Sequence, residues 1–127
     1  MNMNLIMTAV TAIHGIGYIL GPLVTFGVVK TEGFNRASRL LADRLHMSQG
    51  MQQALSLLWI VAMLGFAATS YGLWSGLGWW RTLAWGNVAL SVLVLGIWWT
   101  SFPGNIPVQA NLGNAAIVAG ILLLKSL

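Results

Sequence analysis

Two long stretches of the chain contain no Asp, Glu, Lys or Arg, and this feature restricts the chain to membrane-spanning folds. One stretch runs from Leu45 to Trp80 and the other from Thr82 to Leu124, with Arg81 between them. An uncharged apolar run of about 18 residues or more is long enough to cross a bilayer as a helix. The composition agrees, because 57% of the residues are hydrophobic and only 6% are charged, unlike water-soluble domains.

Turn and polar residues divide the chain into four expected spans. These cover residues 5–29, 52–74, 82–102 and 106–124. The short connections after the second and third spans imply antiparallel neighbours. We therefore predict an all-α fold, with residues 1–127 forming a single transmembrane domain. Its architecture is a four-helix transmembrane bundle with a short cytoplasmic interfacial helix between spans 1 and 2.

The connection between spans 1 and 2 carries six of the eight charges, all between Lys30 and Arg44. Asn35 is an expected helix cap, and the residues after it have one apolar and one charged face, typical of a helix in the headgroup layer. The expected partners are membrane lipids, with anionic headgroups near four basic residues, and not nucleic acid. Those residues are Lys30, Arg36, Arg39 and Arg44. The positive-inside rule places residues 30–50 in the cytoplasm and both termini outside.

Tryptophans gather near the expected span ends, as in the aromatic belts of membrane proteins. Trp98 and Trp99 are the expected belt on the cytoplasmic side. The expected belt on the outer side consists of Trp74, Trp79, Trp80 and Trp85. Trp59 lies too deep in the second span to belong to either belt.

The first span carries one stripe of polar and small residues at helical spacing, and the other spans carry similar stripes. The stripe in the first span consists of Met7, Thr11, His14, Tyr18, Gly21 and Thr25. His14 is the only imidazole inside a span. It is either a neutral group hydrogen-bonded to another helix, or an acid–base group, a ligand contact or an axial haem ligand.

Depth estimates from the helix rise bring the polar residues of the four spans to similar levels near the midplane. One hypothesis is a small polar and aromatic cavity, and the other is that these groups hydrogen-bond one another and leave no cavity. The candidate catalytic residues are His14 and Tyr18. The candidate ligand-binding residues are Trp59, Met63, Ser91, Asn111 and Asn114.

Several kinds of chemistry have no residues to support them. No Asp or Glu lies in a span, which disfavours a carboxylate-driven proton antiporter, and the chain has no cysteine. The sequence contains no phosphate-binding loop, no metal cluster and no nucleophile–base–acid set. We predict no cofactor and no metal, with a b-type haem at His14 as the alternative.

At the level of pattern, the chain resembles small four-span bacterial inner-membrane proteins of unassigned function that are distantly DoxX-like. The matching residues are His14 with Gly15, Leu58 with Trp59, Trp79 with Trp80, Ser91, Trp98, Gly104 and Asn111. Such proteins often have a second His where Tyr18 stands here. The resemblance implies a helical bundle in a bacterial inner membrane and implies no mechanism.

Three functions remain open from the sequence. The first is a non-enzymatic accessory or oligomer-forming component, including a homo-oligomer, which small residues on the helix faces favour. These residues are Gly17, Gly21, Gly72, Gly76, Ala116 and Gly120. The second is binding, or isomerase- or cyclase-type conversion, of a lipophilic small molecule around His14, with Tyr18 or Asn114 orienting it. The third is a small transporter or channel, which the lack of intramembrane charge disfavours.

Overall fold

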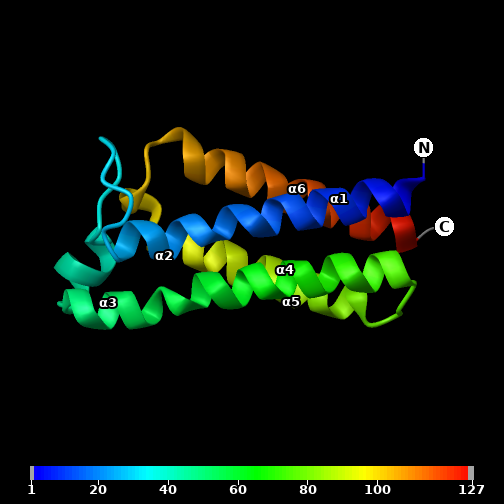
Figure 1. The fold of residues 1–127 in the computed structure, drawn as a ribbon, viewed down its shortest axis with the longest axis horizontal. Coiled ribbons are helices and arrows are strands. Elements are labelled where there is room, and N and C mark those ends of the chain that lie inside the picture. The colour runs from blue at the N-terminus through cyan, green and yellow to red at the C-terminus, as the bar shows by residue number, and fades with distance from the viewer. Residues whose placement is uncertain (1, 126–127) are drawn as a thin grey trace.

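The chain folds into a bundle of long helices that run side by side (Figure 1). The computed structural model describes residues 2–125, and of Lys125 only the backbone. The first span consists of α1 (Met3–Ile16), a 3₁₀ turn η1 (Gly17–Ile19) and α2 (Leu20–Thr25). The second consists of α3 (Gln49–Leu55) and α4 (Leu57–Ser75). The third is α5 (Trp80–Ile97), followed by the 3₁₀ turn η3 (Trp99–Ser101), and the fourth is α6 (Asn105–Lys125).

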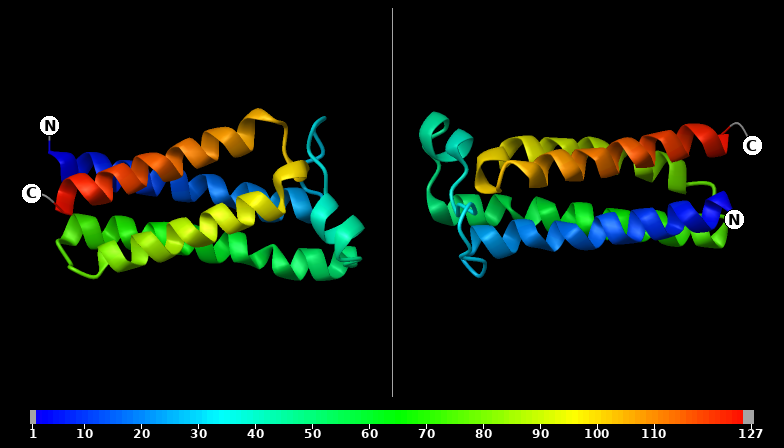
Figure 2. Two further views of the ribbon diagram at one scale, coloured as in Figure 1. Left: turned by 180° about the vertical axis from the view of Figure 1, so that it is seen from behind. Right: turned by 90° about the horizontal axis from the view of Figure 1, so that it is seen from above.

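Each long helix packs chiefly against two neighbours, so the four spans form a closed ring. The first span packs against α4 and α6, and α5 packs against the same two helices. The start of α1 and the end of α6 lie at one end of the bundle, and the connection between α2 and α3 lies at the other (Figures 1 and 2). The all-α four-helix prediction is therefore confirmed.

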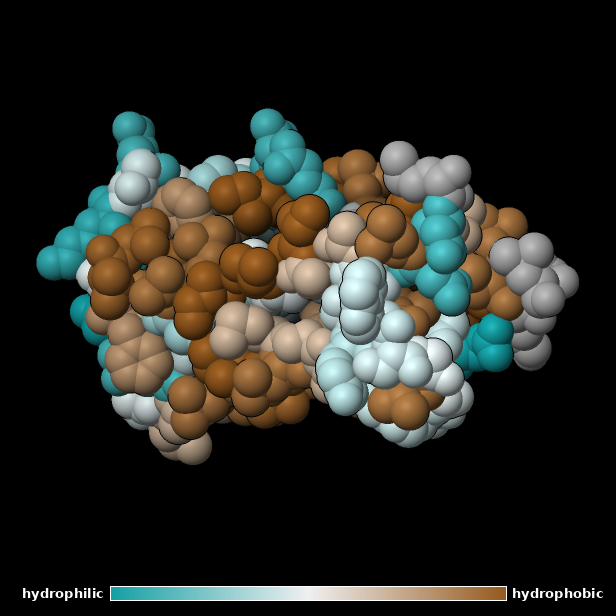
Figure 3. Space-filling model, turned by 45° about the vertical axis from the view of Figure 1, so that its right-hand side comes forward, coloured by the Kyte–Doolittle hydropathy of each residue, from teal (hydrophilic) through white to brown (hydrophobic). Residues whose placement is uncertain are grey.

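Within the described part of the chain, four helical segments are long and apolar enough to cross a membrane. They are Met3–Thr25, Gln49–Ser75, Trp80–Ile97 and Asn105–Leu124. Large apolar side chains cover much of the outer surface, including Ile13 and Leu64, which are 71% and 59% exposed. Brown apolar residues accordingly spread across much of the face in Figure 3. In a water-soluble protein this surface would drive aggregation, whereas lipid tails solvate it.

Local sequence explains where several helices begin and end. The Asn2 side chain accepts a hydrogen bond from the Asn4 backbone N–H and caps α1. Ser48 accepts one from the Met51 backbone N–H and caps α3. At the end of α4, Gly76 adopts a φ of 70°, and the Leu77 N–H reaches back to the Gly72 carbonyl. This closure favours glycine, because other residues rarely adopt a positive φ.

Two tryptophans expected in the aromatic belts are buried, and that part of the prediction is wrong. Trp98 is 1% exposed, because α5 ends at Ile97 and the chain turns inward there, which places the indole against Trp59. Trp80 is 8% exposed and packs against Gly72. Trp74, Trp79, Trp85 and Trp99 are exposed on the surface, as expected for belt residues.

The connection between the first two spans contains less helix than expected. Its helical part is a single π-helical turn, η2 (Leu40–Arg44), and Leu41 is its buried anchor. Asn35 does not cap this turn, so that expectation is wrong. Its side chain donates to the Thr100 carbonyl and its backbone N–H donates to the Ser101 carbonyl. Because its side chain is bonded to η3, Asn35 does not cap η2.

Buried hydrogen bonds attach the same connection to the bundle. The Ser38 backbone N–H donates to Gln52 Oε1 at 2.9 Å, and the Gln52 amide donates to the Met47 carbonyl at 3.1 Å. The Ser38 hydroxyl donates to the Ile97 carbonyl. Ser38 is fully buried and Gln52 is 1% exposed. The connection is therefore held against α3 by the Gln52 side chain and against α5 by the backbone carbonyl of Ile97.

Candidate functional site

Polar groups from three helices meet in one hydrogen-bonded cluster. His14 Nε2 lies 2.8 Å from Asn114 Oδ1, and Ser91 Oγ lies 2.9 Å from the same oxygen. The Tyr18 hydroxyl contacts Ser91 Oγ and lies 3.3 Å from His14 Nε2. The Asn114 amide nitrogen lies 3.4 Å from Asn111 Oδ1. The cluster therefore joins α1 and η1 to α5 and α6.

Helical spacing explains why these side chains converge. His14 and Tyr18 are four residues apart, so both face α6, and Asn111 and Asn114 are three apart on α6. Tyr18, Ser91 and Asn114 are buried, whereas His14 is only half-buried. Asn111 is half-buried as well, so His14 and Asn111 are the outer members of the cluster.

Small residues allow the imidazole to fit between the helices. A Cβ atom at Gly113 would lie 2.5 Å from His14 Nδ1, so α6 approaches the ring only because residue 113 has no side chain. On the other side of α1, a Cβ at Gly15 would lie 2.7 Å from the Phe66 Cβ. Phe66 also makes an edge contact with the imidazole, with ring centroids 4.8 Å apart.

Next to the cluster lies a crevice of about 390 Å³, within the size range of small-molecule sites. Its walls are the second half of the first span and the first half of α6. The residues lining it are Ile13, His14, Gly17, Tyr18, Leu20, Trp59, Leu95, Phe102, Ile106, Gln109 and Ala110. Most of these side chains are apolar, so the crevice has a hydrophobic lining. The lining side chains that carry polar groups are His14, Tyr18, Trp59 and Gln109.

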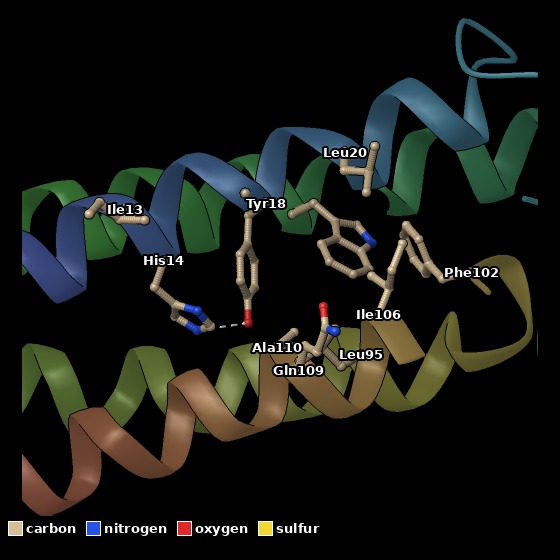
Figure 4. Close-up of a pocket in the computed structure, with 11 residues that line it drawn as sticks. Ile13, His14, Tyr18, Leu20, Leu95, Phe102, Ile106, Gln109 and Ala110 are labelled. Carbon is tan, nitrogen blue, oxygen red and sulfur yellow. Dashed lines mark hydrogen bonds between the residues drawn. The ribbon is translucent and has the colours of Figure 1, made fainter. Parts of the chain in front are cut away.

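The crevice opens on the side of the bundle. α6 packs against α1 but scarcely touches α2, and Figure 1 shows it diverging from the first span toward its own start. Ile13, Gly17 and Gln109 at the rim are exposed on the outer surface. Figure 4 shows His14 and the Tyr18 hydroxyl pointing toward α6, and the Gln109 amide extending from α6 toward the same space. The crevice is therefore open on the outer face of the bundle and reaches His14 and Tyr18 of the cluster.

Aromatic rings form the inner wall of the crevice. Trp59 lies between Tyr18 and Phe102, with ring centroids 5.4 Å from each, and it also contacts Trp98. The indole nitrogens of Trp59 and Trp98 are buried and have no hydrogen-bond partner among the described residues. Trp59 fits because Gly21 faces its ring, where any Cβ would overlap the indole.

The structure separates the candidate residues into three groups. His14, Tyr18 and Trp59 line the crevice. Ser91, Asn111 and Asn114 belong to the hydrogen-bonded cluster but do not line the crevice. Met63 is in neither, and its backbone carbonyl instead faces Gly15. Both hypotheses therefore hold in part, because the polar groups bond one another and a crevice remains beside them.

Sequence reasoning missed most of the lining. Leu95, Phe102, Ile106 and Ala110 are ordinary apolar residues, and no sequence signal distinguishes them from lipid-facing ones. Gln109 is a polar residue at the start of an apolar span, and a polar residue in that position can indicate a binding site, so its place in the lining could have been predicted.

The small residues that favoured an oligomer are partly used inside the chain. Gly72 packs against Trp79 and Trp80, and Gly120 packs against Met7, as Gly21 does against Trp59. A Cβ at Gly17 or Gly76 would meet nothing within 4 Å.

Among the residues that the structure describes, no group of three or more His, Cys, Asp or Glu side chains is placed to hold a metal ion. The b-type haem alternative at His14 stays a prediction. No protein-family model, curated protein or solved structure matches the chain. The resemblance to small DoxX-like membrane proteins therefore also stays a prediction, and the site must be interpreted from its own geometry.

Proposed function

We propose that this membrane protein binds a lipophilic small molecule in the crevice between the first span and α6. The observation that carries this proposal is the lateral opening of an apolar crevice whose wall also includes the polar side chains of His14 and Tyr18. The apolar lining suits a hydrocarbon chain or ring, and His14, Tyr18 and Gln109 supply the few polar contacts that fix orientation in such sites.

Binding accounts for the geometry better than the two other functions do. An accessory or oligomer-forming role draws support from small residues, but Gly21, Gly72 and Gly120 make contacts inside the chain. A transporter or channel would need a pathway through the bundle, whereas the crevice opens to the side and no carboxylate lies in a span. Isomerase- or cyclase-type conversion at His14 would be an additional step on a bound ligand.

We place the protein in a bacterial inner membrane, with both termini outside and residues 30–50 in the cytoplasm. The support is the resemblance to small bacterial membrane proteins together with the basic residues of the connection. Arg36, Arg39 and Arg44 are exposed at that end of the bundle, where anionic lipid headgroups would lie.

The test is to identify what copurifies with the protein in mild detergent, by lipid extraction and mass spectrometry. Ala110→Phe places a ring in the crevice, and Ala116→Phe places the same ring on the lipid-facing side of α6. We expect a lipophile in near-stoichiometric amount with the wild type and with Ala116→Phe, and its loss from Ala110→Phe. Bulk lipid alone in the wild type, or equal retention by both variants, would contradict the proposal.

A further inference from the structure

Arg81 is a cation with no carboxylate side chain near it, at the end of the bundle where α1 begins and α6 ends. The chain has only two acidic residues, Glu32 and Asp43, and both lie in the connection at the opposite end (Figure 1). One guanidinium N–H donates to the Leu124 backbone carbonyl at 2.9 Å, and the guanidinium carbon lies 5.2 Å from the Trp80 ring centroid. These contacts hold the side chain in place, and neither supplies a full negative charge.

Most of the hydrogen-bonding capacity of this guanidinium is unused. A guanidinium carries several N–H donors on three nitrogen atoms. Apart from the bond to Leu124, Arg81 makes no side-chain hydrogen bond to any residue that the structure describes. Its Nε atom is buried, whereas Nη1 is not among the buried nitrogen atoms that lack a partner. Nη1 is therefore at the surface, where an acceptor from outside the chain can reach it.

A pocket of about 510 Å³, the Arg81 pocket, lies at this position. Its wall includes Trp80 and Arg81 at the start of α5 and Asn2 and Asn4 at the start of α1. The Asn2 side chain uses its oxygen to cap α1, and the Asn4 side chain makes no hydrogen bond to a described residue. Amide N–H groups therefore remain free in the pocket that the guanidinium lines, and such a set of donors suits an anion.

A second hollow of about 340 Å³, the Leu5 groove, adjoins the Arg81 pocket and extends along α1 by about one helical turn, to Thr8. The residues that the two hollows share are Asn2, Asn4, Leu73 and Gly76. The groove also includes Leu5 of α1 and Trp74 of α4, which are 47% and 69% exposed. The polar pocket is therefore continuous with an apolar groove on the lipid-facing surface.

The Arg81 pocket lies at the headgroup level of the membrane. Its lining comes from the ends of the membrane-spanning segments, which begin at Met3 and Trp80 and end at Ser75 and Leu124. The hydrocarbon core lies inside such ends, and the lipid headgroups lie beyond them. A phosphate oxygen is therefore an acceptor that is present at this depth, and a guanidinium forms strong charge-assisted hydrogen bonds with phosphate.

We propose that the Arg81 pocket binds the phosphate of an anionic phospholipid, with an acyl chain of the same lipid in the Leu5 groove. Arg81 supplies the positive charge, and the amides of Asn2 and Asn4 supply further N–H donors. A zwitterionic lipid fits less well, because its ammonium group would approach Arg81 with no Asp or Glu at this end to pair with it. The site is separate from the crevice, because the two share no lining residue.

The test is native mass spectrometry of the protein in mild detergent with equal amounts of phosphatidylglycerol and phosphatidylethanolamine that carry the same acyl chains. The quantity measured is the ratio of the two lipids in the first lipid adduct. Arg81→Gln removes the charge from the pocket, and Arg44→Gln removes the same charge from the exposed surface at the opposite end. We expect Arg81→Gln to lower the preference for phosphatidylglycerol by roughly fivefold, the effect of one partly exposed charged hydrogen bond. Arg44→Gln should stay close to the wild type, and an equal ratio in the two variants would overturn the site.

A second pair of variants keeps Arg81 and adds a competing charge. Asn2→Asp places a carboxylate in the pocket and preserves the cap of α1, because Asp caps helices as well as Asn does. Asn105→Asp places the same charge at the start of α6, outside the pocket. We expect Asn2→Asp to lose the preference for phosphatidylglycerol and Asn105→Asp to keep it. If Arg81→Gln does not fold, this pair decides, and equal retention by both variants would overturn the proposal.

Inorganic phosphate offers the same oxygens without an acyl chain, so it distinguishes a lipid site from a site for a free anion. We expect phosphatidylglycerol to stay bound in an excess of inorganic phosphate, because the Leu5 groove holds the chain. Displacement of the lipid by inorganic phosphate would overturn the lipid assignment. Ala110→Phe, which fills the crevice, should leave phosphatidylglycerol bound. Its loss from that variant would assign the lipid to the crevice and overturn this second site.

Discussion

His14 and Asn114 stand 100 positions apart in the chain, and their side chains lie 2.8 Å apart in the structure. The contact joins the first and fourth spans, and Ser91 brings the third span to the same amide oxygen. One amide group therefore holds three helices in register. Such contacts contribute to stability inside a membrane, where helices gain little from apolar burial against one another.

Replacing that amide should weaken the bundle. Asn114→Leu leaves the His14 N–H and the Ser91 hydroxyl without their acceptor, so we expect the free energy of unfolding to fall by about 1–3 kcal/mol. Asn111→Leu removes only the 3.4 Å bond and should cost less than about 1 kcal/mol. Tryptophan fluorescence during a denaturing-detergent titration measures both. Equal stability of the two variants would contradict the central role of Asn114.

Two glycines of the first span provide a matched pair for testing helix packing. Gly21 faces the Trp59 ring, so Gly21→Ala must displace the indole and should cost about 1–3 kcal/mol. Gly17 faces open space with a helical φ of −59°, so Gly17→Ala should be neutral or stabilising by up to about 1 kcal/mol. The same titration compares them. If Gly21→Ala were as stable as Gly17→Ala, the contact between Gly21 and Trp59 would not be tight.

The attachment of the charged connection depends on Gln52. In Gln52→Leu, the buried Ser38 N–H and the Met47 carbonyl lose their partners, so this segment should detach more often. We expect amide hydrogen exchange at Ser38 to accelerate by roughly tenfold to a hundredfold. Gln53→Leu is the control, because the adjacent Gln53 side chain makes no such bond among the described residues. Unchanged exchange in Gln52→Leu would show that the other bonds of the segment, including those of the Ser38 hydroxyl and Asn35, are enough to hold it.

The proposed orientation can be tested with single cysteines, because the native chain has none. Thr31 lies in the connection between the first two spans, Ser75 is the last residue of α4 at the opposite end of the bundle, and both are exposed. We expect a membrane-impermeant maleimide to label Ser75→Cys in intact cells or spheroplasts, and to label Thr31→Cys only after permeabilisation. The reverse pattern would invert the orientation. Labelling of both from one side would contradict the crossing of the membrane by the second span, which lies between these two positions.

Helical periodicity located much of the buried interior from sequence alone. Thr11, Tyr18, Ser91 and Asn114 were expected on inward-facing stripes, and all four are buried. The spans were also predicted correctly, because a long run without charged residues is a local property of the sequence and is enough for a helix to partition into a bilayer. The belt assignment, which rested only on nearness to a span end, failed for Trp98, because whether an indole near a helix end faces lipid or the core depends on the path of the chain after Ile97.

Charge-free runs and helical spacing were therefore enough to predict the membrane-spanning class, the four spans and the inward face of each helix. Which inward groups meet, and where space remains between them, followed only from the packing of the helices. The pairing of His14 with Asn114 requires α6 to approach at Gly113, and the crevice requires the same helix to diverge from α2 around Ile106. The physical reason is that helical periodicity sets the direction of a side chain, whereas the distance between two helices depends on side-chain volumes contributed from both.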